Sequence, residues 1–360
     1  MTQRVHNFYA GPSTLPLPAL ERAQKEFLDF ADAGMSVMEM SHRCKEYDAV
    51  HQEALALVRD LLKVPATHHI GLCQGGASLQ FAQIPMNFLP GGKSADYVLT
   101  GVWADKAIKE ANLLGKTRIA GTSKATGFDR IPTQLDLDPN AAYVHITSNN
   151  TIYGTQFQTF PAVGNVPLVC DMSSDIMSRP VDVSKFAMIY AGAQKNMGPS
   201  GVVVVIIADE FLKKARTDLP TMLRYDVLIQ ENSLYNTCPT FGIYMLRNVL
   251  AYTKQQGGLA AMEKHNREKA AEIYAVIDRF PAFYKGYAQK ADRSTMNLTF
   301  RLPTEELEKK FEKEATAAGL IGLKGHRSAG GIRASLYNAM TREGVKALAQ
   351  FMVDFQTKNA

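Results

Sequence analysis

Residues 186–207 read FAMIYAGAQKNMGPSGVVVVII, and this stretch decides the fold class. Its two apolar runs, 186–190 and 202–207, each have the length of a short strand, and only a Gly-rich segment separates them. We therefore predict that the two runs pair directly in one sheet. Apolar runs buried on both faces are typical of the mostly parallel sheet of an α/β protein. Between the runs lies Lys195, in a setting of small residues.

Further short apolar runs alternate with helical stretches earlier in the chain. We expect two helices before the sheet, one with apolar positions from Leu20 to Phe30 that Gly34 ends, and one over 50–61. The alternation predicts a large domain with a mostly parallel sheet flanked by helices. The remaining strands of this sheet are expected at 70–73, 97–99, 143–146 and 166–170.

The pattern of predicted helices and strands changes after about residue 255, where Gly257-Gly258 interrupts regular secondary structure. The pattern then predicts a smaller α+β domain, and Thr304 is expected to cap its second helix. We expect 16–255 to form the large domain, and 1–15 with 256–360 to form the small one. The elements expected after the break are helices from 259 to 280, from 305 to 318 and from 345 to 355, and strands at 295–302 and 332–336.

The charge balance excludes one class of function. Lys plus Arg number 40 and Asp plus Glu 35, a net charge of 40 − 35 = +5, and the longest basic stretch is a pair such as Lys213-Lys214. Nucleic-acid binders concentrate basic residues in runs or stripes, so we expect no nucleic-acid partner. A weakly basic globule also suits small anionic ligands.

Cysteine usage and apolar run length indicate the compartment. The four cysteines, Cys44, Cys73, Cys170 and Cys238, show neither CxxC spacing nor a disulfide-rich pattern, so we expect a reducing compartment and no metal site. The N-terminal Met1-Thr2-Gln3-Arg4 leads into polar residues rather than a signal peptide. The longest apolar run, 202–208, is too short to span a membrane. We expect a cytoplasmic protein without a membrane partner.

Two glycines, Gly75 and Gly76, turn the chain from a strand into a helix. Free backbone N–H groups at such a helix start form a phosphate site, and Ser78 adds a hydroxyl. The alternative is a plain strand-to-helix turn, because the segment is neither a Walker loop nor a G-x-G-x-x-G fingerprint.

Polar and aromatic side chains follow four other predicted strands: Trp103, Thr151, Asp171 and Lys195. Ligands of open α/β sheets lie outside the carboxyl ends of the strands. A desolvated lysine there can act as an amine nucleophile, and the glycines around it suggest close approach to a ligand. Taken singly, these residues could be a core tryptophan, a capping aspartate and a surface lysine. Together with the phosphate cradle they indicate a pyridoxal 5′-phosphate site.

Longer motifs carry a resemblance that covers essentially all 360 residues. With them the chain resembles the class V family of fold-type I pyridoxal-phosphate aminotransferases, and within it the members that exchange an amino group between L-glutamate and 3-phosphohydroxypyruvate. The resemblance implies that fold, a large α/β domain plus a smaller α+β C-terminal domain. The motifs are NFYAGP at 7–12, SVMEMSHR at 36–43, YAGAQKN at 190–196, NTCPT at 236–240, KGHR at 324–327 and GIRASLYNA at 331–339.

The resemblance implies roles around the cofactor. Lys195 would form the Schiff base, Asp171 would hold the pyridine nitrogen protonated, and Trp103 would stack on the ring. Thr151 would bond the phenolic oxygen. A homodimer with shared sites is implied, because Asn236 and Thr237 resemble a pair that reaches the phosphate of the neighbouring subunit. The residues expected to hold the phosphate within one chain are Ala77, Ser78 and Gln194.

The resemblance also implies the substrate contacts. Arg43 matches an arginine that binds glutamate, and Arg333 matches one that clamps the α-carboxylate, a task that suits a guanidinium fork. His42, His326 and Arg327 match residues around the substrate's phosphate or side-chain carboxylate. A second reaction is implied, the formation of 4-phosphohydroxy-L-threonine for vitamin B6.

The chain departs from some relatives at two places, and two other functions are considered. Some relatives have Ser in place of Ala10 and Gly-Arg in place of Ala77-Ser78, which leaves open how the phosphate is held. Another class V activity, such as cysteine desulfurase or alanine–glyoxylate transaminase, is the first alternative, although a desulfurase needs a mobile reactive cysteine. The second is a non-catalytic basic binding protein, which the lack of basic runs disfavours.

Overall fold

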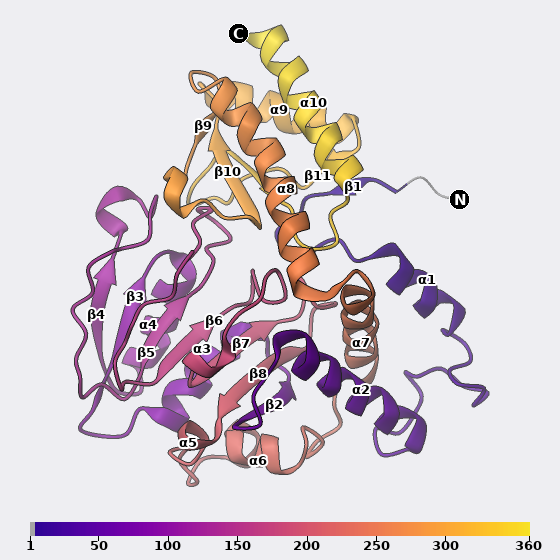
Figure 1. Cartoon of the computed structure of the whole chain (residues 1–360), viewed down its shortest axis with the longest axis vertical. Coiled ribbons are helices and arrows are strands. Elements are labelled where there is room, and N and C mark those ends of the chain that lie inside the picture. Colours follow the sequence, from indigo (N-terminus) through magenta and orange to yellow (C-terminus); the bar gives the residue numbers. More distant parts are fainter. Residues whose placement is uncertain (1–3) are drawn as a thin grey trace.

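The computed structural model describes residues 4–360 and shows a wide lower body beneath a narrower upper lobe (Figure 1). A seven-stranded sheet forms the centre of the lower body, with strand order β2-β8-β7-β6-β5-β3-β4. Its strands are β2 (His68–Cys73), β3 (Ser94–Leu99), β4 (Lys116–Thr122), β5 (Val144–Thr147), β6 (Leu168–Asp171), β7 (Met188–Gly192) and β8 (Val203–Ala208).

The sheet is mostly parallel, as the sequence predicts. Strands β4, β3, β5, β6 and β7 run parallel as neighbours, whereas β8 is antiparallel to both β7 and β2. The predicted direct pairing of the two runs around Lys195 is confirmed, with Tyr190 opposite Val205. Because β8 is antiparallel to both of its neighbours, β2 runs in the same direction as the parallel strands. The carboxyl end of β2 therefore lies at the same edge of the sheet as the carboxyl ends of those strands.

Helices cover both faces of this sheet and bury alternate side chains of each strand. In β8, Val204 and Ile206 pack in one core with α2 and α7, whereas Val203 and Val205 pack in another with α3 and α4. This alternation follows from the two-residue period of a strand. The helices of the lower body are α1 (Leu17–Lys25), α2 (Lys45–Leu62), α3 (Gly76–Phe88), α4 (Val102–Asn112), α5 (Asp209–Leu212), α6 (Tyr225–Gln230) and α7 (Thr240–Gln255).

The upper lobe has its own apolar core, to which Phe8 from the N-terminal segment contributes. Thr304 accepts a hydrogen bond from the backbone N–H of Leu307, so the predicted helix cap is confirmed. The lobe contains a three-stranded sheet of order β12-β10-β9 and a parallel pair β1-β11. Its elements are β1 (His6–Asn7), α8 (Gly258–Arg279), β9 (Lys285–Gly286), β10 (Asn297–Arg301), α9 (Glu305–Ala317), β11 (Leu320–Ile321), β12 (Ile332–Ser335) and α10 (Arg342–Asn359).

Two local expectations were wrong. The first helix ends at Lys25, not near Gly34. A helix that continued to Gly34 is excluded by the positive φ angles of Ala31 and Asp32, 58° and 56°. Phe30 still reaches the core, but from a turn. The edge strand β4 was missed, because only Ala120 is buried in it and its sequence contains no apolar run. The domain boundaries stay a prediction.

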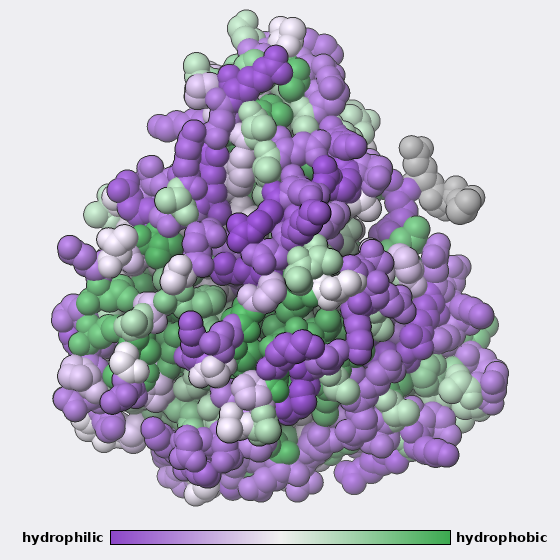
Figure 2. Space-filling model, in the orientation of Figure 1, coloured by the Kyte–Doolittle hydropathy of each residue, from purple (hydrophilic) through white to green (hydrophobic). Residues whose placement is uncertain are grey.

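The described part of the chain was searched for apolar surface, membrane-spanning helices and metal-binding groups. Figure 2 shows that the lower body exposes more apolar surface on this face than the upper lobe, which hydrophilic residues mostly cover. No helix within residues 4–360 is both long and apolar enough to cross a membrane. The same residues contain no group of three or more His, Cys, Asp or Glu side chains arranged to hold a metal ion. Residues 1–3 of the N-terminal segment lie outside the described part.

Candidate active site

A cavity of about 390 Å³ lies where the strands of the large sheet reach their carboxyl ends. It combines nine of the residues that the sequence singled out, and they come from β2, β3, β5, β6, β7, β11 and β12 or from the segments that follow these strands. Such a position is where open α/β sheets bind ligands. The nine residues are Ala77, Ser78, Trp103, Thr151, Asp171, Gln194, Lys195, His326 and Arg333.

Lys195 follows β7 in a turn whose backbone is held from the N-terminal segment. The Ser13 hydroxyl donates to the Lys195 carbonyl oxygen at 2.6 Å, and the Ser13 N–H donates to the Gln194 carbonyl at 3.0 Å. The Lys195 Nζ donates to Thr151 Oγ1 at 2.9 Å. Burial lowers the pKa of Lys195 to about 8, with Asp171 opposing and Arg333 reinforcing that change. The amine is thus available in its neutral, nucleophilic form near neutral pH.

Asp171 is the last residue of β6, and its carboxylate is buried at the cavity. It accepts a hydrogen bond from the Ser173 N–H at 2.9 Å. Burial raises the pKa of Asp171, while Ser173 and the Lys195 ammonium oppose that rise. A cationic group of a bound ligand would restore the charged carboxylate, because an opposite charge favours the ionised form.

Trp103 lies in the first turn of α4, and its ring faces the lysine. The Lys195 Nζ lies 5.9 Å from the centroid of the indole. Three atoms lining this cavity, Trp103 Nε1, Thr147 Oγ1 and Arg333 Nε, are buried without a hydrogen-bond partner among residues 4–360. Buried polar groups normally have partners, so these atoms point to a ligand with its own polar groups.

The amino end of α3 provides the phosphate cradle that the sequence predicts. Gly75 has a φ of 86° as it turns the chain into the helix, a conformation that favours glycine. The N–H groups of Gly76, Ala77 and Ser78 lie in the first turn, where a helix leaves them without intrahelical partners. These donors and the helix dipole suit an anion.

The glycines near Lys195 also lie close to other parts of the chain, and the predicted approach to a ligand stays a prediction. A Cβ on Gly192 would collide with the side chain of Gln194. A Cβ on Gly198 would lie 3.2 Å from the Cα of Leu246 in α7. The glycines thus make room for the chain itself, and Gly192 lets Gln194 turn toward the cavity.

Arg333 and His326 approach the cavity from the upper lobe. Arg333, on β12, donates to the Thr151 carbonyl at 3.5 Å. The His326 Nδ1 lies 2.8 Å from the Ser328 hydroxyl, and burial lowers the pKa of His326, helped by the charges of Arg333, Arg327 and Lys106. This end of the cavity therefore concentrates positive charge.

Five residues expected in the site do not line the cavity of their own chain: His42, Arg43, Arg327, Asn236 and Thr237. Arg43 is exposed and donates from Nε to the Nε2 of His42 at 3.3 Å. The Asn236 Nδ2 donates to the Gln74 Oε1 at 3.2 Å, beside the phosphate cradle turn, and Thr237 is exposed. These side chains are free to serve a site other than the cavity described above.

Sequence reasoning missed several residues that line the cavity. Thr147 is the last residue of β5 and Ser173 follows β6, so the rule that selected Asp171 would have found both. Nothing in the sequence marked Phe81 of α3 as a cavity residue, because an apolar residue in a helix normally packs in the hydrophobic core. The other lining residues to which the sequence assigned no role are Ala10, Gly11, Asn149, Ile152 and Ser174.

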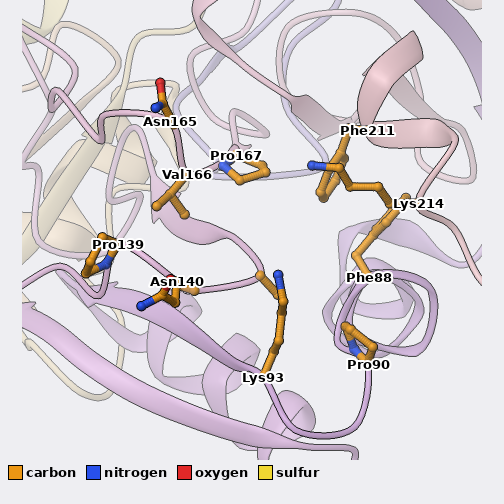
Figure 3. Close-up of a pocket in the computed structure, with 12 residues that line it drawn as sticks. Phe88, Pro90, Lys93, Pro139, Asn140, Asn165, Val166, Pro167, Phe211 and Lys214 are labelled. Atoms are coloured by element: carbon orange, nitrogen blue, oxygen red, sulfur yellow. The ribbon is translucent and has the colours of Figure 1, made fainter.

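A second cavity, of about 250 Å³, lies at the opposite edge of the sheet, before β3, β5 and β6 begin. Figure 3 shows the ammonium groups of Lys93 and Lys214 directed toward it. Its lining includes no acid, base partner or hydroxyl, so it offers no catalytic group beyond two exposed lysines. It is lined by Phe88, Pro90, Lys93, Pro139, Asn140, Ala141, Ala142, Asn165, Val166, Pro167, Phe211 and Lys214.

The first cavity fits the cofactor that the sequence predicts. Pyridoxal phosphate has an aldehyde, a basic ring nitrogen, a flat ring and a phosphate. The cavity offers an amine of lowered pKa, a buried carboxylate, an indole with an unpartnered N–H, and a helix amino terminus. Each part of the cofactor therefore has a chemically matched group.

Comparisons with known proteins agree with this chemistry. The family model described as aminotransferase class-V matches residues 5–348. The chain is 56% identical over 361 residues to a phosphoserine aminotransferase of Lysinibacillus sphaericus (strain C3-41), covering 100% of both proteins. The solved phosphoserine aminotransferase from Bacillus circulans subsp. alkalophilus superposes with a TM-score of 0.98 at 53% identity, covering 100% of both chains. The pyridoxal-phosphate-bound phosphoserine aminotransferase of Trichomonas vaginalis superposes with a TM-score of 0.93 at 39% identity, covering 97% of this chain and 100% of that one.

Proposed function

Because the chain belongs to the aminotransferase class-V family, we propose that it is a pyridoxal-phosphate-dependent phosphoserine aminotransferase. It moves an amino group reversibly between L-glutamate and 3-phosphohydroxypyruvate, forming 2-oxoglutarate and O-phospho-L-serine, a step of serine biosynthesis. The observation that carries the proposal is one cavity in which a lysine of lowered pKa faces an indole, a buried carboxylate and a helix amino terminus.

The residues proposed to hold the cofactor follow from the cavity. Lys195 Nζ is the attachment point for its aldehyde carbon, Asp171 pairs with its ring nitrogen, and Trp103 stacks on the ring. The first-turn N–H groups of α3, with Ser78 and Gln194, receive the phosphate. Bound pyridoxal phosphate supplies an electron sink that stabilises negative charge at the α-carbon of the substrate.

Lys195 is proposed to move the proton. Its Nζ, neutral in part near pH 8, would take the proton from the substrate α-carbon and deliver it to the C4′ carbon of the bound cofactor. Thr151, 2.9 Å from this nitrogen, orients the amine. Asp171 lies close enough for its charge to raise the pKa of Lys195, so it stabilises the ammonium after the proton transfer.

Arg333 is proposed to bind the α-carboxylate of each substrate. Its guanidinium lies at the cavity with Nε unpartnered among the described residues, so it retains donors for a carboxylate fork. His326 lies at the same end and can face the distal phosphate or carboxylate. Arg327, exposed next to it, adds charge at the mouth.

We propose that the enzyme is a homodimer in which each chain completes the site of the other. Asn236 and Thr237 do not line their own cavity, and neither do His42 and Arg43, which supports service to a partner site. The neighbouring Tyr235 is 49% exposed, a large apolar side chain that an interface would bury. In this arrangement Arg43 brings a guanidinium for the distal carboxylate of glutamate.

The alternative class V activity of a cysteine desulfurase is disfavoured by the cysteines. Burial raises the pKa of Cys73 to about 12, and burial also raises the pKa of Cys170 well above its usual range. A thiol held in this way is not a nucleophile at neutral pH. We further propose 4-phosphohydroxy-L-threonine as a second product and a cytoplasmic location, on the resemblance and the cysteine pattern alone.

Single-turnover spectroscopy tests the proposed function. The purified enzyme is mixed with L-glutamate and then with 3-phosphohydroxypyruvate, while the visible band of the lysine-bound cofactor is followed. We expect the band to vanish in the first step and return in the second. A protein that bound no cofactor, or whose band returned with pyruvate but not with 3-phosphohydroxypyruvate, would contradict the assignment.

A further inference from the structure

Lys106, a residue without an assigned role, lies one turn after Trp103 on α4. Its Nζ lies 4.6 Å from the centroid of the Trp103 indole, within the range of a cation–π contact. Among the described residues it has no ion-pair partner, whereas Lys109 on the same helix pairs with Asp105 at 2.7 Å. The indole is therefore the one feature that holds the Lys106 ammonium in place.

Lys106 lies close enough to the cavity for its charge to act on groups that line it. Burial lowers the pKa of His326, the charges of Arg333 and Arg327 add to this, and the charge of Lys106 makes the smallest contribution. Trp103 lines the same cavity as His326 and Arg333, so the ammonium that lies on the indole sits beside a wall of that cavity. The other charged group near this indole is Lys195, whose Nζ lies 5.9 Å from the ring centroid, farther away than that of Lys106.

We propose that Lys106 is a specificity-determining residue, whose ammonium on the Trp103 ring favours a phosphate dianion over a carboxylate at the distal end of the substrate. The inference rests on the proposed function, since that function defines the two substrates. The attraction of a fixed cation scales with the charge of the ligand. A phosphate with a charge near −2 therefore gains more from Lys106 than a carboxylate of −1 does.

The test compares two keto acids on one enzyme form. The amino form of the enzyme is mixed with 3-phosphohydroxypyruvate or with 2-oxoglutarate, and the ratio of the two kcat/KM values is measured. Any loss of folding or cofactor cancels in this ratio. We expect Lys106→Met to lower the preference for the phosphorylated acid about two- to fivefold, the range of one solvent-exposed charge interaction.

Matched variants separate the effect of a charge at position 106 from the effect of net charge on the helix. Lys109→Met removes the same charge from the same helix, but from an ammonium held by Asp105, and should leave the ratio unchanged. Lys106→Arg keeps a cation that stacks on aromatic rings and should restore it. A ratio that fell equally in the Lys109→Met variant would reduce the effect to net charge and overturn the proposal.

The fluorescence of Trp103 gives a readout that does not depend on turnover. Trp103 is the single tryptophan of the chain, so its emission reports this contact alone. In cofactor-free protein we expect Lys106→Met, but not Lys109→Met, to change the emission intensity. Unchanged emission would show that the ammonium does not sit on the indole.

The experiment distinguishes a failure of the proposed function from a failure of the role proposed for Lys106. A wild-type enzyme inactive with both keto acids would remove the proposed function and, with it, the role of Lys106. An active wild-type enzyme whose ratio survives Lys106→Met would remove only the role of Lys106.

Discussion

At the scale of the residue, the surroundings of Lys195 decide its chemistry. Burial lowers its pKa from 10.5 to about 8, so the neutral amine is half populated near pH 8. We expect the rate at which cofactor-free protein captures pyridoxal phosphate to rise with pH up to about 8 and to level off above it. An exposed lysine would give a rate that rises to about pH 10.4. Stopped-flow absorbance from pH 6 to 10 distinguishes the two profiles.

Removal of the same amine tests its role in proton transfer. We expect Lys195→Ala to lower kcat by about 10²–10⁴-fold, the usual contribution of a positioned acid–base group, and to abolish the band of lysine-bound cofactor. Steady-state kinetics and absorbance spectra measure both effects. Lys185→Ala, at an exposed lysine shortly before β7, should leave them unchanged. A Lys195→Ala protein that kept the band and turned over normally would refute the assignment.

At the scale of the element, helix α9 depends on its cap. Thr304 Oγ1 accepts from the Leu307 N–H at 3.2 Å and satisfies one of the free donors of the first turn. We expect Thr304→Ala to lower the free energy of unfolding by about 1 kcal/mol, and Thr304→Ser to lower it much less. Urea denaturation of the holoenzyme measures the difference. Equal losses in both variants would show that the hydroxyl is not the stabilising group.

Helix α8 is joined to the loop after β12 by a buried lysine. The Lys269 Nζ donates to the carbonyl oxygens of Leu336 and Tyr337 at 2.7 Å and of Met340 at 3.1 Å. We expect Lys269→Met to destabilise the protein by about 1–3 kcal/mol, because buried carbonyls lose their donor. Thermal denaturation tests this, and Lys264→Met, at an exposed position of the same helix, is the control. A Lys269→Met protein as stable as the control would contradict the expectation.

At the scale of the whole molecule, shared sites predict complementation between chains. A chain with Lys195→Ala and a chain with Asn236→Ala and Thr237→Ala each form impaired homodimers. A mixed dimer has one intact site, because Lys195 comes from one chain and Asn236 from the other. After unfolding and refolding an equal mixture, we expect activity of about a quarter of wild type, since half of the dimers are mixed and half of their sites intact.

The complementation needs a reference. The parents, refolded separately and then combined, give the activity without exchange of subunits. A refolded mixture no more active than this reference would show that Asn236 and Thr237 serve their own chain. Sedimentation of the same samples shows whether dimers formed.

Local sequence signals predicted the parts of the fold that need no distant partner. The apolar runs became central strands because strands buried on both faces must be apolar along their length. Thr304 became a cap because that contact spans three residues. By contrast, β4 was missed because this edge strand buries only Ala120, and the first helix was predicted too long because Phe30 reaches the core from a turn. In both cases the apolar pattern recorded burial rather than backbone conformation.

The sequence by itself determined which residue types follow the strand ends, and these sufficed to predict the cofactor site around Lys195, Asp171 and Trp103. Only the tertiary structure decided that Arg333 and His326 join them from the upper lobe, that Arg43 and Asn236 do not, and that Lys106 lies on the indole. The physical reason is range. The direction of a strand fixes where its end lies, but contacts between separate lobes depend on how their apolar cores pack, which no local pattern encodes.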